Sequence, residues 1–135
     1  MRKLLSTKYS AGAFSAAMLT LRLIFGILMM NHGYGKLKNF NETAAHMPNL
    51  FHMGSGFTTA LVIFAEFFCA LFIILGLFTR LATIPIIICM CYALFVTHNA
   101  EVFGKGEMAT LYLGAFLVLL FVGPGRVSVD SMIGK

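Results

Sequence analysis

Long apolar segments constrain the fold of this chain more than any other feature. Four of them stand out among the 135 residues, at positions 11–35, 57–78, 81–97 and 108–122. About 20 apolar residues in an α-helix cross a hydrocarbon core of about 30 Å, so the first two segments are long enough and the last two are near the lower limit. Because no alternating strand pattern for a closed barrel is present, helices are the expected spanning structure.

Composition and connections point to the same architecture. Hydrophobic residues make up 59% of the chain and charged residues 11%, whereas soluble domains have about 45–50% and about 25%. Only Thr79 and Arg80 separate the second and third segments, which predicts a tight antiparallel hairpin. Pro124 is expected to end the last helix. We therefore expect one membrane domain over residues 1–135, an all-α integral membrane fold built as an antiparallel bundle of four transmembrane helices.

The positions of lysine and arginine predict the orientation. Cytoplasmic loops carry an excess of these residues, and the excess is largest here when both termini are cytoplasmic. The inner face then holds Arg2, Lys3, Lys8, Arg80, Arg126 and Lys135, and the outer face holds Lys36, Lys38 and Lys105. We expect a multi-pass protein of the inner (plasma) membrane with a retained first helix. The net charge of +5 predicts no nucleic-acid partner, because the basic residues are spread singly or in pairs.

Two ionisable residues lie about half-way along the first two segments. They are Arg22 and Glu66. An isolated charge at that depth costs roughly 2.5–3.5 kcal/mol on insertion scales. Antiparallel neighbours would place the two residues at similar depth, which predicts an Arg22–Glu66 ion pair. Two roles remain open for it: a lock between two helices, or part of a polar pocket that binds an anion, a quinone or a proton.

Polar and small residues share one side of the first helix. At 100° per residue, one stripe contains Arg22, Gly26, Met29, Gly33 and Lys36, with His32 beside it. Glycines on such a stripe allow a neighbouring helix to come close, so we expect it to face the bundle interior. The residues of the candidate polar pocket are Arg22, His32, Lys36, Glu66 and Glu107.

Histidine and cysteine patterns predict no metal site. The four histidines show no H-x-x-H, H-E-x-x-H or Glu-x-x-His spacing. All three cysteines lie in apolar segments, where we interpret them as packing residues. Cys89 and Cys91 point to different sides of a helix, so a self-contained dithiol reaction is not expected.

Several motifs, taken in order, resemble the DoxX family of small four-helix membrane proteins. They are RLIFG-x5-HGYGKL from Arg22 to Leu37, Glu66 before a glycine-ended apolar run, GLFTRLA from Gly76 to Ala82, and E-x4-YLGAFLVLLFVGPGRVSVD from Glu107 to Asp130. The resemblance implies a compact four-helix bundle. It also implies association with membrane complexes that handle thiol or sulfur redox chemistry, although the family fixes a fold better than a reaction.

The resemblance and the ionisable groups together favour one functional hypothesis. The chain would be a membrane subunit of a quinone-linked thiol or sulfur oxidoreductase. The sequence does not identify a cofactor, with quinone as one candidate, and leaves catalytic turnover undecided. The alternative is a non-catalytic anchor or assembly subunit for a soluble partner. A small-solute transporter has less support, because no inverted repeat is visible. The expected partners are the lipid bilayer and either another protein or a second copy of this chain.

Overall fold

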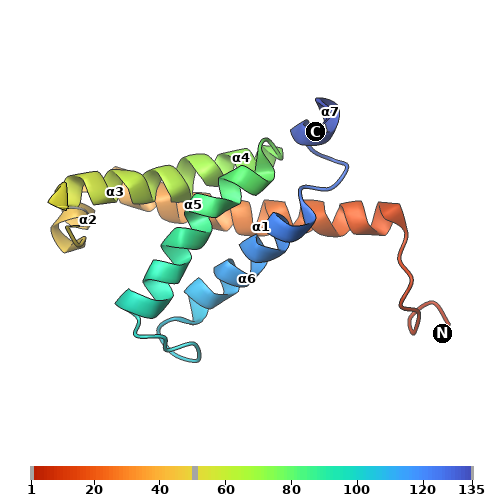
Figure 1. Ribbon diagram of the computed structural model, residues 1–135, viewed down its shortest axis with the longest axis horizontal. Coiled ribbons are helices and arrows are strands. Elements are labelled where there is room, and N and C mark those ends of the chain that lie inside the picture. The colour runs from red at the N-terminus through yellow and green to blue at the C-terminus, as the bar shows by residue number, and fades with distance from the viewer. Residues whose placement is uncertain (1, 50–51, 135) are drawn as a thin grey trace.

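The computed structural model describes residues 2–49 and 52–134, and within those ranges the chain is all-helical with no strand (Figure 1). In chain order the elements are α1 (Ala11–Lys38), α2 (Phe40–His46), α3 (Ser55–Ile63), the π-helical segment η2 (Phe64–Cys69), α4 (Ala70–Leu75), α5 (Thr79–Tyr92), the π-helical segment η3 (Ala93–Thr97), α6 (Glu107–Val122) and α7 (Val129–Met132).

Among the described residues, three helices are long and apolar enough to cross a membrane. They are α1, the continuous helix Ser55–Leu75 that comprises α3, η2 and α4, and the continuous helix Thr79–Thr97 that comprises α5 and η3. α6 is equally apolar but has 16 residues. Many large apolar side chains on these helices are exposed, among them Leu81 at 66%, Ile88 at 63% and Phe121 at 73%. A lipid environment accommodates such a surface, and the protein is a membrane protein.

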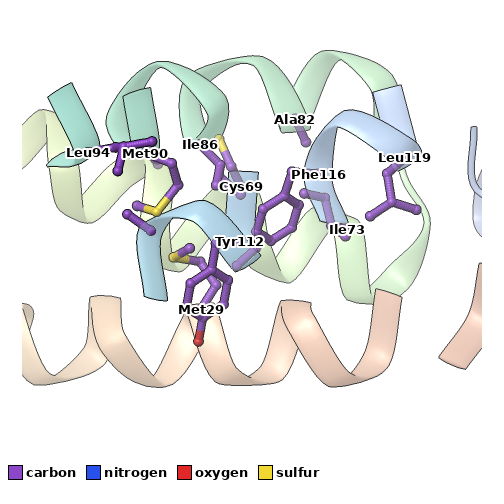
Figure 2. Packing of buried hydrophobic residues seen from close by; sticks show 13 residues of the cluster. Met29, Cys69, Ile73, Ala82, Ile86, Met90, Leu94, Tyr112, Phe116 and Leu119 are labelled. Carbon is purple, nitrogen blue, oxygen red and sulfur yellow. The ribbon is translucent and has the colours of Figure 1, made fainter. Parts of the chain in front are cut away.

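The helices form two pairs. α1 lies alongside the helix Ser55–Leu75, contacting both α4 and η2, and these two run along the longest axis of the molecule (Figure 1). α5 packs mainly against α6, and this second pair crosses the first obliquely. The buried side chains where the pairs meet include Met29, Cys69, Ile73, Ile86, Met90, Phe116 and Leu119 (Figure 2).

The connection between the second and third spanning helices differs from expectation. The helix predicted over 57–78 ends at Leu75, and the next begins at Thr79 rather than at 81. Gly76 explains the early end, since its φ of 73° is the left-handed conformation in which glycine ends many helices. The hairpin is still tight, but its connection is residues 76–78.

Two glycines set the register of α1 against its neighbour. A Cβ atom on Gly33 would lie 2.6 Å from the backbone nitrogen of Phe67, and one on Gly26 would lie 2.7 Å from Cγ1 of Ile74. Both distances are shorter than side chains tolerate, so only glycine permits this approach. The predicted interior stripe is confirmed for Arg22, Gly26, Met29 and Gly33, which are buried together with Ser15 and Met18. Lys36 is only half-buried, and His32 is exposed.

Candidate functional site

The predicted Arg22–Glu66 ion pair is wrong. Arg22 donates its hydrogen bonds to backbone carbonyls, and Glu66 pairs with Lys36. The register explains the difference, because Glu66 lies beside Gly33 and the Arg22 guanidinium lies beside Gly76. Arg22 and Gly33 are eleven positions apart, which is roughly 16 Å along a helix. The two charges therefore belong to separate clusters.

Arg22 joins three parts of the chain through backbone atoms. Its side chain donates from Nε to the Ile73 carbonyl (2.9 Å), from Nη2 to the Ile74 carbonyl (2.8 Å), and from Nη1 to the carbonyls of Pro124 (3.1 Å) and Val127 (2.5 Å). Ile73 and Ile74 belong to the last turn of α4, where helical carbonyls lack their usual partners, and the Ile73 carbonyl also accepts from the backbone nitrogen of Gly76 at 3.1 Å. Arg22 is 1% exposed. Its guanidinium thus caps α4 and holds the segment after α6.

Asp130 completes this Arg22 cluster. Its two carboxylate oxygens accept hydrogen bonds from the backbone nitrogens of Phe78 (2.8 Å) and Thr79 (2.9 Å), at the start of α5. Its own backbone nitrogen donates to the Gly76 carbonyl at 2.8 Å, and its charge interacts with that of Arg22. A carboxylate at a helix N-terminus is favourable, because it accepts from amides that have no helical partner. The sequence reasoning missed Asp130, although it is the only aspartate in the chain.

Lys36 and Glu66 form the centre of the second cluster. The Lys36 Nζ lies 2.7 Å from Oε1 and 2.6 Å from Oε2 of Glu66. The Glu66 side chain is 5% exposed and the Lys36 side chain is 31% exposed. Glu66 belongs to η2, and short π-helical segments inside α-helices occur frequently at functional sites.

A tyrosine and a thiol interact electrostatically with Glu66, and two further rings contact that tyrosine. The His32 ring stands edge-on to Tyr112 with 5.7 Å between ring centroids, and Tyr112 stacks on Phe116 at 6.2 Å. The Tyr112 hydroxyl points toward α1 (Figure 2). Electrostatic interactions link Glu66 to both Tyr112 and Cys89. We call His32, Lys36, Glu66, Cys89 and Tyr112 the Lys36–Glu66 cluster.

The predicted pocket residues are therefore divided. His32, Lys36 and Glu66 belong to one cluster, and Arg22 belongs to the other. Glu107 is the exposed first residue of α6, and its side chain makes no hydrogen bond or ion pair with any residue in the described part of the chain. The sequence did not predict that Tyr112 and Cys89 belong to the Lys36–Glu66 cluster. The signal for Tyr112 was its position four residues before the buried Phe116, on one face of α6.

The side chains of Lys36 and Glu66 can each form hydrogen bonds beyond those between them. A lysine ammonium has three donors, and an ionised carboxylate has about four acceptor positions. The two bonds between them leave room for a further partner on each side chain. No group of three or more His, Cys, Asp or Glu side chains that could hold a metal occurs within residues 2–49 and 52–134. The arrangement can bind a small polar group and transfer a proton to or from it.

Comparison with known proteins adds a family and two bacterial relatives. Residues 17–99 match the DoxX family. The chain is 30% identical over 124 residues to a protein of Escherichia coli (strain K12) named "Inner membrane protein YqjF", covering 87% of this chain and 92% of that one. It is 29% identical over 128 residues to a Haemophilus influenzae protein named "Uncharacterized protein", covering 85% of this chain and 89% of the relative. No solved structure matches the chain significantly.

Proposed function

This chain belongs to the DoxX family of membrane proteins, and on that premise we propose that it is a subunit of a quinone-linked oxidoreductase of the inner membrane. The Lys36–Glu66 cluster is its quinone site. The proposed topology is four antiparallel spans with both termini cytoplasmic. The location is supported by the name of the Escherichia coli relative, an inner membrane protein.

One observation carries the proposal: a nearly buried carboxylate is held by a lysine of a neighbouring helix, beside aromatic side chains. Quinones have an apolar ring that suits aromatic surroundings and carbonyl oxygens that need a hydrogen-bond donor. Lys36 supplies such a donor, and the rings of His32 and Tyr112 supply aromatic contacts. Arg22 offers no free donor, because its hydrogen bonds are directed at backbone carbonyls.

Proton transfer is the chemistry that this cluster contributes. Reduction of a quinone to a quinol consumes two electrons and two protons. Glu66 and His32 are the groups that would deliver these protons, or accept them when the reaction runs in reverse. The electrons would be exchanged with a partner subunit that oxidises a thiol or sulfur compound. Cys89 and Cys91 are two positions apart on one helix and point to different sides, so they do not supply a dithiol for that oxidation.

The test is quinone binding by the purified full-length chain in a mild detergent. We expect the wild-type protein to bind a short-chain ubiquinone and Glu66→Gln to bind it at least about tenfold more weakly, which corresponds to about 1.4 kcal/mol. Glu107→Gln is the matched control, because it makes the same chemical change at an exposed position outside the cluster. Equal quinone affinity in the wild type and Glu66→Gln would disprove the proposal.

A second candidate function, an anchor for a soluble partner, is favoured by the C-terminal segment. Arg22 and Asp130 hold this segment against the α4–α5 connection. The same segment presents exposed apolar side chains, with Val127 at 56% and Met132 at 82%. Under this alternative a soluble protein copurifies in stoichiometric amount, Met132→Glu releases it, and Glu66→Gln leaves its activity unchanged.

A further inference from the structure

A groove of about 610 Å³ lies where α5 begins and α6 ends. Its walls come from residues 78–81, from residues 122–126 and from the C-terminal segment. It is near the Arg22 end of α1, whereas the Lys36–Glu66 cluster is near the other end. Because two apolar helices end here, the groove lies where the protein leaves the hydrocarbon core and meets the lipid headgroups.

The groove has an excess of positive charge. Arg80 and Arg126 both line it and both are exposed. Arg80 donates from Nη2 to the carbonyls of Phe121 (3.4 Å) and Val122 (3.3 Å), and neither arginine forms an ion pair with a carboxylate of the described residues. Asp130 also lines the groove, but it is 6% exposed. Two backbone amides and Arg22 compensate its negative charge. Two guanidinium groups are therefore available to an external anion.

A buried hydroxyl without a partner also lines the groove. Thr79 is 1% exposed, and its Oγ1 makes no hydrogen bond within the part of the chain that the structure describes. Buried hydroxyl groups are nearly always hydrogen-bonded, so an unpaired one beside a groove indicates a missing acceptor. A phosphate oxygen is such an acceptor, and it is also the anion that arginine binds best.

Apolar side chains next to the arginines identify the source of the phosphate. Phe78 is 46% exposed and Leu81 is 66% exposed on the groove wall, and Phe121 is 73% exposed at the adjoining end of α6. A free phosphate ion would make no favourable contact with these apolar side chains, whereas the acyl chains of a phospholipid would cover them. We propose that the groove binds an anionic phospholipid, with its phosphate between Arg80 and Arg126 and its acyl chains against α5 and α6.

The test measures lipid affinity of the full-length protein in detergent micelles doped with phosphatidylglycerol or with phosphatidylcholine, using native mass spectrometry. We expect a preference for phosphatidylglycerol. Arg80→Gln and Arg126→Gln should each weaken phosphatidylglycerol binding about fivefold, and the double variant about 25-fold. Lys38→Gln is the matched control, since it removes one exposed positive charge at the other end of α1 and should leave lipid binding unchanged.

Three results would overturn the proposal. Equal losses in Lys38→Gln and Arg126→Gln would mean that net charge alone attracts the lipid. Displacement of phosphatidylglycerol by an equal concentration of inorganic phosphate would make the free ion the ligand. If the double variant does not fold, Arg126→Gln decides alone, because Arg126 is exposed and makes no hydrogen bond with the described residues. Unchanged phosphatidylglycerol affinity in that variant would exclude the site.

Discussion

The two polar clusters on α1 lie on the same buried stripe, yet their charges are satisfied in different ways. The four hydrogen bonds of Arg22 all end on backbone carbonyls, which cannot rotate away. Lys36 and Glu66 are held by each other, and both are side chains with several rotatable bonds. A buried charge whose hydrogen bonds all end on the backbone, such as Arg22, therefore acts as a structural clamp. A charge satisfied by another side chain can exchange that partner for a ligand.

Removing the clamp should have the largest effect on stability. Arg22→Met leaves the carbonyls of Ile74, Pro124 and Val127 without their donor and Asp130 without its nearby positive charge, so we expect a loss of about 4 kcal/mol in the free energy of unfolding. Arg22→Lys should recover only part of this loss, because a single ammonium cannot reproduce the planar fork of a guanidinium. Thermal unfolding in detergent measures both. A wild-type melting temperature for Arg22→Met would mean that the clamp contributes nothing.

The register between the helices can be tested at Gly33. A methyl group there would overlap the backbone at Glu66 and Phe67, so Gly33→Ala should force α1 and η2 apart. We expect a loss of about 1–3 kcal/mol in stability, together with weaker quinone binding. Gly35→Ala is the control, because its added methyl group meets no atom within 4 Å. Alanine has the higher helix propensity, so an equal loss in Gly35→Ala would mean that close approach at Gly33 is not the cause.

The variant Asp130→Asn tests whether the structural clamp formed by Arg22 depends on the negative charge beside it. Asp130→Asn keeps one oxygen acceptor for the backbone amides of α5 but loses the other and removes the negative charge. The expected loss is about 1 kcal/mol, similar to that of a helix cap. Glu107→Gln should leave the melting temperature unchanged, since Glu107 is exposed. A greater loss for Asp130→Asn than for Arg22→Met would reverse the assigned roles.

The smallest expected effect on stability is at the Lys36–Glu66 pair. A double-mutant cycle with Lys36→Met and Glu66→Gln should give a coupling energy of about 0.5 kcal/mol, because partial exposure of Lys36 weakens the attraction. The same variants should have the largest effect on quinone affinity. A coupling energy as large as the loss for Arg22→Met would make this pair a second structural clamp and remove the distinction between the clusters.

Sequence periodicity predicted the buried stripe of α1 correctly. The residues that pack inside follow the 3.6-residue repeat, and glycines and charges among them stand out against an apolar background. The partner of Arg22 was not predictable in this way. Counting from helix ends gives only an approximate depth, whereas contacts at Gly26 and Gly33 set the actual register. The acceptors of Arg22 are backbone carbonyls, which every residue has, so no residue type in the sequence marks them.

Two further features lie beyond sequence reasoning for similar reasons. The cap that Asp130 provides acts on Phe78 and Thr79, which are 52 and 51 positions away in the chain, whereas recognisable capping patterns are local. The π-helical segment η2 differs from the helix on either side chiefly by Glu66, and a single glutamate does not distinguish FAEFFC from an ordinary helical turn.

The unequal lengths of α1 and α6 bear on the thickness of the surrounding bilayer. With 28 and 16 residues respectively, the two helices measure roughly 42 Å and roughly 24 Å. A hydrocarbon core of about 30 Å is thinner than the length of α1 and thicker than the length of α6. Under the proposed topology of four spans, α1 must tilt or extend into the headgroup region, while lipids beside α6 must compress. The membrane should therefore be thinner on one side of this protein than on the other, and thin bilayers should suit it better than thick, sterol-rich ones.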